Sequence, residues 1–139
     1  MSKDLTLSQF CQDKGGINTQ LTGRWIGEFQ SIASQGKKNT GRLNSKVQPN
    51  GIYEGLIENH QEKRKGITLG GFCNNNQFLA TYEYNVPKFK YEYWLPEYTV
   101  QSSNGSIKKI TPTLIEGSSI ERDENNNIIS RTYFRLRKQ

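Results

Sequence analysis

Residues that commonly bind metals are scarce in this sequence. It has one histidine and two cysteines among 139 residues, and its 13 acidic residues are spread along the chain. A zinc site needs several histidine or cysteine ligands, and a calcium site needs clustered carboxylates. We therefore expect neither a metal site nor a cofactor.

Long apolar runs are also absent. No stretch approaches the roughly 18 to 20 apolar residues that cross a bilayer as a helix. The N-terminal sequence "MSKDLTLSQF" lacks the charged-then-apolar order of a signal peptide. These absences predict a cytoplasmic protein with no membrane partner.

The two cysteines, Cys11 and Cys73, do not form a CxxC pair. In a reducing compartment two widely spaced thiols are typical of small packed side chains rather than of a disulfide or a metal pair. We expect both to be buried thiols.

Catalytic signatures are missing as well. The single histidine, His60, lies between Glu58 and Glu62 in a polar turn region, where exposure is the ordinary outcome. No nucleophile elbow, phosphate loop or dinucleotide fingerprint occurs. We predict a protein that is not an enzyme.

The length suits one domain, because 139 residues are too few for two of ordinary size. Hydrophobic residues make up 32% of the chain and the mean hydropathy is −0.82, which favours strands with one wet face. Helix signals are confined to the start, where Thr6 or Asp4 is a candidate N-cap. We divide the chain into a helical plug or arm (residues 1–16) and a β domain (17–139).

From Leu21 onward the pattern alternates and is broken by turn-forming clusters at short intervals. The segments between them predict eight antiparallel strands, at residues 22–33, 40–48, 52–59, 66–72, 78–84, 89–100, 107–120 and 128–138. Closure of the sheet into a barrel is favoured by glycines inside the strands, because a closed sheet must bend sharply at such positions. These glycines are Gly23, Gly27, Gly55, Gly70, Gly71 and Gly117. The expected fold is all-β, a single closed eight-stranded antiparallel up-and-down β-barrel with a short N-terminal helix.

The stretch "LTGRWIGEF" opens the first strand. Gly23 would let this strand cross the barrel floor, and Trp25 would then fill the closed end. A guanidinium from the last strand could lie over the indole. That strand places three arginines on one face, opposite Phe134 and Leu136: Arg131, Arg135 and Arg137.

"LTGRW" and the final "YFRLRK" resemble the signature of the calycin barrels, which include lipocalins, fatty-acid-binding proteins and avidins, and are most similar to the avidin form. The resemblance implies a calycin-like barrel in which Arg135 partners Trp25. A second likeness joins "GRWIGEF" and "LATYEYNVP", which look like the barrel module of bacterial antiphage effectors that sense cyclic nucleotides. It implies a nucleotide sensor.

Aromatic residues gather between Phe78 and Trp94. Phe78, Tyr82 and Tyr84 share one face of a strand, and Phe89, Tyr91 and Tyr93 share one face of the next. A cavity lined with tyrosines would suit a flat polar ligand such as a nucleobase. The alternative is that these rings pack the core or pair across strands on the outside. The cations expected near the rim are Arg42, Lys46, Lys88 and Lys90.

The net charge of +6 favours anionic partners without selecting one. Our first hypothesis is a non-enzymatic barrel that senses or sequesters an anionic aromatic ligand such as a cyclic nucleotide, in bacterial antiphage defence or counter-defence. The second is a protein-interaction module, an inhibitor or immunity protein with a basic surface and a filled core. The third is a single-stranded nucleic-acid binder, which scattered cations make less favourable. A homo-oligomer remains open.

Overall fold

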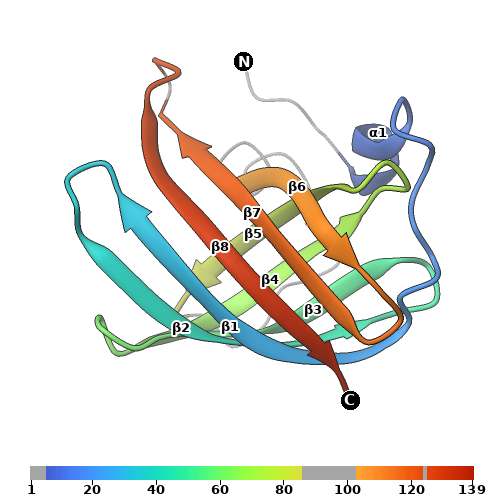
Figure 1. Cartoon of the computed structure of the whole chain (residues 1–139), viewed down its shortest axis with the longest axis horizontal. Coiled ribbons are helices and arrows are strands. Elements are labelled where there is room, and N and C mark those ends of the chain that lie inside the picture. Colours follow the sequence, from blue (N-terminus) through green and yellow to red (C-terminus); the bar gives the residue numbers. More distant parts are fainter. Residues whose placement is uncertain (1–5, 86–102, 124) are drawn as a thin grey trace.

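The computed structural model describes residues 6–85, 103–123 and 125–139. A five-residue helix precedes eight strands (Figure 1). The elements are α1 (Leu7–Cys11), β1 (Gly23–Ala33), β2 (Lys38–Val47), β3 (Ile52–Asn59), β4 (Arg64–Phe72), β5 (Gln77–Tyr84), β6 (Ser103–Ile110), β7 (Leu114–Arg122) and β8 (Ile128–Lys138).

The strands form one closed barrel in sequence order. Every neighbouring pair is antiparallel, and β1 pairs with β2 on one side and with β8 on the other. Because β1 pairs with β8, the sheet closes on itself, and neither of these two strands is a free edge. The expectation of an all-β, eight-stranded up-and-down barrel with a short N-terminal helix is confirmed.

Residues 103–122 form two strands where the sequence analysis expects one over 107–120. β6 ends at Ile110 and β7 begins at Leu114. In the turn, the Thr111 hydroxyl accepts hydrogen bonds from the backbone N–H groups of Thr113 at 3.2 Å and Leu114 at 2.9 Å. Pro112 fits because proline presets the backbone for a tight turn. The expected strand at residues 89–100 lies outside the described residues.

One end of the barrel interior is filled by apolar side chains. Trp25 is 1% exposed, and its indole N–H donates to the backbone oxygen of Leu21 at 2.9 Å. The buried residues that pack together here are Leu21, Trp25, Val47, Tyr53, Phe72, Phe78, Ile107, Ile115 and Leu136. The structure thus places Trp25 inside the barrel, among these apolar side chains.

An interior glycine makes room for an aromatic ring on the neighbouring strand. Gly41 of β2 lies opposite Phe29 of β1. A Cβ atom at Gly41 would run into the Phe29 ring and the backbone of Glu58. The ring therefore covers bare backbone, an arrangement that stabilises glycines in curved sheets.

Helix α1 packs against the outer wall of the barrel. Thr6 caps it, because its hydroxyl accepts from the Gln9 backbone N–H at 3.2 Å while the Gln9 side chain accepts from the Thr6 N–H at 2.9 Å. Leu7 lies so close to Gly71 of β4 that a Cβ atom there would collide with it. The buried residues of this second cluster are Leu7, Cys11, Ile67, Leu69, Cys73 and Leu79.

A disulfide joins Cys11 of α1 to Cys73, next to the end of β4. The expectation of two free buried thiols is therefore wrong, although both residues are buried as expected. The sequence argument assumed a reducing compartment, and the 62-residue separation gave no sign that helix packing on β4 and β5 would bring the sulfur atoms together.

Candidate ligand cavity

The barrel encloses a cavity of about 440 Å³. Ligand pockets typically measure roughly 300 to 1,000 Å³ and have apolar walls. Its apolar floor is formed by Trp25, Phe29, Val47, Tyr53, Phe72, Phe78, Ile115, Phe134 and Leu136. Burial raises the pKa of Tyr53 to about 12, against the opposing effect of a hydrogen bond with Thr68, so this hydroxyl is neutral at physiological pH.

Above the floor, four polar side chains form one row across four neighbouring strands. Thr132 of β8 pairs in register with Ser119 of β7 and with Ser31 of β1, and Ser31 pairs with Asn39 of β2. All four line the cavity. The Thr132 hydroxyl lies 3.2 Å from that of Ser31. We call this set the polar row.

The polar row ends in an unsatisfied acceptor. The side-chain oxygen of Asn39 is buried and has no hydrogen-bond partner among the described residues. Buried polar atoms in proteins are nearly always paired, and leaving one unpaired is costly. A ligand that carries a hydrogen-bond donor would remove that cost.

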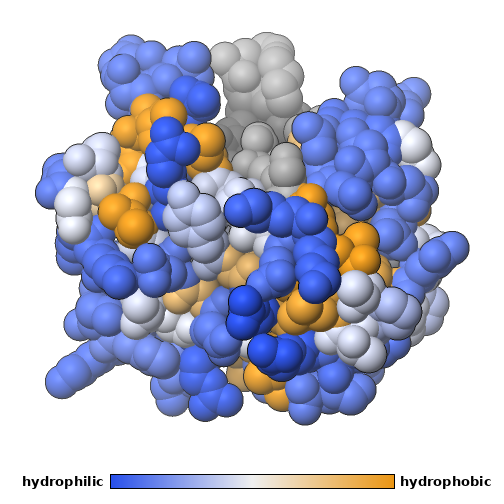
Figure 2. All heavy atoms as spheres, in the orientation of Figure 1, coloured by the Kyte–Doolittle hydropathy of each residue, from blue (hydrophilic) through white to orange (hydrophobic). Residues whose placement is uncertain are grey.

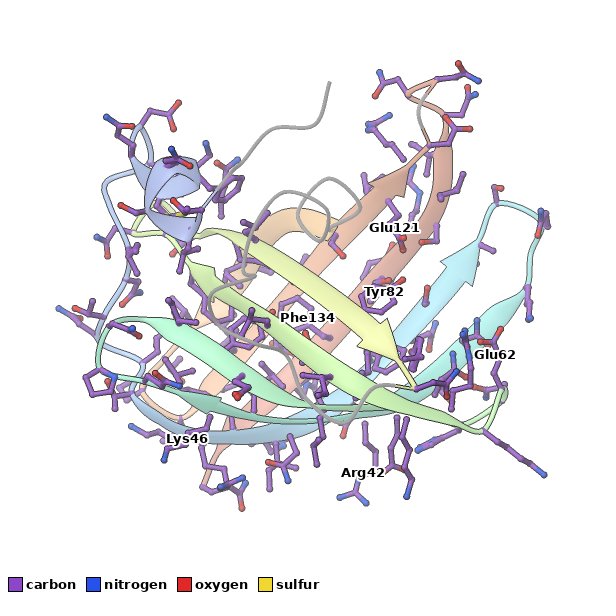
Figure 3. The ribbon with its side chains drawn as sticks, turned by 180° about the vertical axis from the view of Figure 1, so that it is seen from behind. Arg42, Lys46, Glu62, Tyr82, Glu121 and Phe134 are labelled. Carbon is purple, nitrogen blue, oxygen red and sulfur yellow. A yellow bond between two sulfur atoms is a disulfide. The ribbon has the colours of Figure 1, made fainter. Side chains whose placement is uncertain are left out.

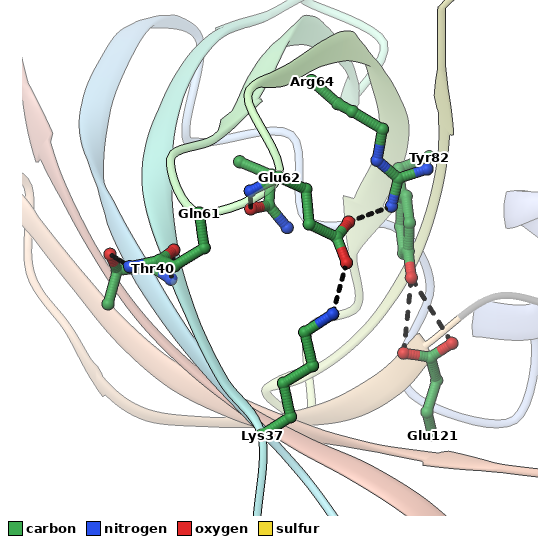
Figure 4. Close-up of polar contacts among 8 residues, drawn as sticks. Lys37, Thr40, Gln61, Glu62, Arg64, Tyr82 and Glu121 are labelled. Atoms are coloured by element: carbon green, nitrogen blue, oxygen red, sulfur yellow. Dashed lines mark hydrogen bonds and ion pairs between the residues drawn. The ribbon is translucent and has the colours of Figure 1, made fainter.

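The polar end of the cavity, its mouth, carries a charged cluster on β4 and the turns beside it (Figure 4). Glu62 pairs with Lys37 at 3.0 Å and also with Arg64. Hydrogen bonds from Lys37 and then Arg64 hold the pKa of Glu62 below its ordinary value. The Arg64 guanidinium also lies over the Tyr84 ring, 4.3 Å from its centroid, so Arg64 is engaged on two sides.

Across the mouth, Glu121 of β7 faces Tyr82 of β5 (Figures 3 and 4). The Tyr82 hydroxyl lies 3.4 Å from both Glu121 carboxylate oxygens, and the Ser130 hydroxyl donates to one of them at 3.0 Å. Burial, followed by the charge of Glu121, raises the pKa of Tyr82. Glu121 has no ion pair within the part of the chain that the structure describes.

Two of the predicted ligand-binding residues line the cavity and two do not. Tyr82 and Tyr84 line it, and their rings meet edge to face with centroids 5.6 Å apart. Arg42 and Lys46 point away from the barrel (Figure 3). They alternate with the inward residues Leu43 and Ser45 on β2, so neither can contact a ligand in this cavity. The predicted residues Lys88, Lys90, Tyr91 and Tyr93 lie outside the described residues.

The predicted contact between Trp25 and Arg135 is not formed. Phe134 and Leu136 line the cavity, so alternation along β8 directs Arg135 outward. There it pairs with Glu116 at 2.7 Å and lies in register with Glu28. The wall formed by β7, β8 and β1 is largely hydrophilic, with hydrophobic residues in small separate groups (Figure 2).

Gly23 has a backbone conformation at the start of β1 that disfavours a side chain. Its φ angle of +136° is unfavourable for residues with a side chain. A Cβ atom there would meet the side chain of Lys138 at 2.8 Å. The backbone angle, more than this contact with a flexible lysine, therefore favours glycine at this position.

The polar row, Glu121 and Arg64 are not among the residues predicted from the sequence. A signal existed for part of this set, because inward positions on β1 and β8 can be counted in steps of two from Trp25 and Phe134. That count places Ser31 and Thr132 inside. On β7 the sequence offers no comparable anchor, because its alternation predicts a single strand over residues 107–120.

His60, the one candidate acid–base residue, is exposed in the turn between β3 and β4. Its neighbour Glu62 is engaged by Lys37 and Arg64. Among the described residues no group of three or more histidine, cysteine or acidic side chains is placed to hold a metal ion. Within the same residues, no helix combines the length and the apolar character needed to cross a membrane.

No protein-family model and no curated protein matches the chain. Three solved barrels are similar in structure, each with a TM-score of 0.50. A de novo designed fluorescence-activating β-barrel is 11% identical over 87% of this chain and 96% of its own. A redesigned barrel, b11L5F_LGL, is 10% identical over 86% and 92%. EF1p2_mFAP2b bound to DFHBI is 10% identical over 86% and 94%.

At these identities the likeness is one of fold. It supports the eight-stranded β-barrel and does not show membership in the calycin family or kinship with antiphage sensors. Fold alone does not determine function, so the functional argument depends on the cavity.

Proposed function

We propose that this protein binds a small, flat, mostly apolar ligand inside the barrel, without turnover. The observation that carries the proposal is the cavity of about 440 Å³, with an aromatic floor below a row of polar side chains. Such a combination provides apolar contact area together with a few polar groups that fix orientation. The edge-to-face tyrosines Tyr82 and Tyr84 at the mouth offer further aromatic surface.

Two of the similar structures support a ligand in a barrel of this architecture. The de novo designed barrel is fluorescence-activating, and EF1p2_mFAP2b is bound to DFHBI. The second of these shows that a barrel of similar fold can hold a small organic molecule. Their identity to this chain is too low to transfer the ligand itself.

Nucleotide sensing, with a role in antiphage defence or counter-defence, stays a prediction from resemblance. Tyr82 and Tyr84 favour it, because tyrosine rings stack on bases. A phosphate would also need cations around it. Arg64 is the one cation among the described lining residues, and it is already paired with Glu62. Nucleotides therefore enter the experiment as competing ligands rather than as the proposed class.

The protein-interaction alternative assumed a barrel filled by its own side chains. The cavity does not fit that version of the hypothesis. A partner on the outer surface remains compatible with the cations directed outward, such as Arg42 and Lys46.

The cytoplasmic location also stays a prediction. The Cys11–Cys73 disulfide favours an oxidising compartment, because such bonds rarely persist in a reducing one.

The experiment that tests the proposal uses a neutral dye whose fluorescence rises in apolar surroundings, N-phenyl-1-naphthylamine. We expect saturable binding to the wild type. The variant Ser119→Phe should abolish it, because Ser119 is buried and lines the cavity. Ser118→Phe adds the same ring on the outward side of β7 and should leave binding unchanged.

Two outcomes would contradict the proposal. One is the absence of dye binding by the wild type. The other is equal binding by both phenylalanine variants, which would place the dye on the surface. Circular dichroism of each variant shows whether the barrel has formed, and competition by mononucleotides and cyclic dinucleotides tests the nucleotide prediction on the same cavity.

A further inference from the structure

We infer that the ligand is an aromatic amine that binds as a cation, with its ring on the apolar floor and its ammonium group between Glu121 and the Asn39 side-chain oxygen. This inference rests on the proposed function, because it assumes that the cavity accepts a ligand. To the proposed function it adds the charge of the ligand and the side chains of the barrel wall that would bind the charged group.

The two acceptors line the same cavity from opposite ends of the polar row. Asn39 is one end of the polar row, whose other end is Ser119 of β7. Glu121 is two residues after Ser119 on the same strand, and both line the cavity. Side chains two residues apart on a strand point to the same face. The carboxylate of Glu121 therefore lies above the Ser119 end of the polar row, toward the mouth.

The hydrogen bonds that each acceptor makes leave room for a cation. Glu121 receives hydrogen bonds only from neutral hydroxyls among the described residues, those of Tyr82 and Ser130. Its negative charge has no ion-pair partner there. Asn39 presents a buried oxygen with no donor at all in that part of the chain. An ammonium group carries three donors and a positive charge, which matches both deficits.

The cationic side chains described at the mouth form ion pairs with a different carboxylate, that of Glu62. Lys37 and Arg64 both bind Glu62, and Arg64 also covers the Tyr84 ring. In Figure 4, Tyr82 lies between Arg64 and Glu121. Among the described residues the charges at the mouth are thus divided, with the paired cations Lys37 and Arg64 around Glu62 and a carboxylate without an ion pair on β7. An anionic ligand would face Glu121, and no described cation lining the cavity is free to offset that charge.

The test uses three indoles of nearly equal shape as competitors of N-phenyl-1-naphthylamine. Tryptamine is a cation at neutral pH, 3-ethylindole is neutral and indole-3-propionate is an anion. We expect tryptamine to compete about tenfold better than 3-ethylindole, because a hydrogen bond to a charged group adds enough free energy for that ratio. Indole-3-propionate should compete least.

Three variants locate the effect. Glu121→Gln should remove the preference for tryptamine and leave 3-ethylindole unchanged. Glu116→Gln makes the same change of net charge on the same strand, but Glu116 pairs with Arg135 on the outer wall, so the preference should persist. Asn39→Leu should weaken tryptamine binding more than 3-ethylindole binding.

The outcomes separate this inference from the proposed function. If the dye binds and tryptamine competes no better than 3-ethylindole, the inference is overturned and the ligand cavity stands. The same holds if Glu116→Gln removes the preference as fully as Glu121→Gln, because the effect would then be one of overall charge. If the dye does not bind the wild type, both fail.

Discussion

The Tyr82 hydroxyl lies 3.4 Å from both carboxylate oxygens of Glu121, although β5 and β7 are not neighbours in the barrel. The strand between them, β6, pairs with β5 from Gln77 to Ala80 among the described residues. Tyr82 lies beyond that described pairing, where its side chain connects β5 to Glu121 of β7. These two side chains hold the wall together at the point where a ligand would enter.

Removing that hydroxyl should weaken the mouth without unfolding the barrel. We expect Tyr82→Phe to lower the free energy of unfolding by about 0.5 to 1.5 kcal/mol, the usual contribution of one hydrogen bond. Urea denaturation measures it. Tyr133→Phe is the matched control, because Tyr133 is exposed on the outer face of β8. Equal effects of both variants would mean that the Tyr82 hydroxyl contributes nothing specific.

The disulfide should stabilise the attachment of α1 more than the barrel itself. Replacing Cys11 and Cys73 together by serine should cost about 2 to 4 kcal/mol, because the bond restricts a long loop of the unfolded chain. Hydrogen exchange should increase in α1 and the adjacent outer faces of β4 and β5, where the helix packs. Exchange in β1 and β8 should change little.

A reducing agent provides the control for that prediction. It should lower the thermal midpoint of the wild type and have no effect on the double serine variant. Mass spectrometry of the native protein, alkylated before reduction, shows whether the bond exists. Two alkylated cysteines in freshly isolated protein would contradict the disulfide and restore the argument for a reducing compartment.

The Glu62 cluster should make stability depend on acidity. Hydrogen bonds from Lys37 and Arg64 lower the pKa of Glu62 below its ordinary value of 4.5. The unfolded state therefore takes up a proton first as the pH falls. The stabilisation is present above about pH 4.5 and is lost as the pH falls through the lower folded-state value.

Comparing variants isolates this contribution. The stability difference between the wild type and Glu62→Gln, measured by urea denaturation, should shrink as the solution becomes acidic. In Lys37→Met, the Glu62 carboxylate should titrate closer to its ordinary value, because the largest cause of the shift has gone. A difference that grows on acidification would have the wrong sign and contradict the pairing.

Much of the architecture could be predicted from the sequence, because a strand repeats every two residues and each turn interrupts that repeat. Alternation around Trp25 and Phe29 was sufficient to predict β1 and its inward face. The turn at Pro112 was missed because the alternation continues across it: Ile107 and Ile115 are both odd-numbered and both buried. When buried residues keep the same two-residue alternation on both sides of a hairpin turn, the sequence pattern of the hairpin is indistinguishable from that of one long strand.

The site was harder to predict, because residue type does not determine which way a side chain points. A shift of one residue moves a whole strand face from the cavity to solvent. Arg42 and Lys46 were chosen for their charge and lie outside, whereas Ser31 and Thr132 attracted no attention and lie inside. The Arg135 assignment followed a family resemblance, while the apolar neighbours Phe134 and Leu136 already indicated the opposite face.

Asn39 should oppose stability in the free protein. Its buried side-chain oxygen lacks a donor among the described residues, and an unpaired polar group costs about 1 to 3 kcal/mol. Asn39→Leu has nearly the same shape and no polar atoms, so we expect the free energy of unfolding to rise by about 1 kcal/mol, measured by urea denaturation.

The same substitution on the outer face should behave differently. Asn44 lies on the same strand and accepts a hydrogen bond from Arg24 at 2.9 Å, so Asn44→Leu should not stabilise the protein. If Asn39→Leu proved less stable than the wild type, its oxygen would have to be satisfied in solution, for example by a bound water. A more stable variant that binds the amine less well would instead show that the free barrel retains an unfavourable group which the ligand then satisfies.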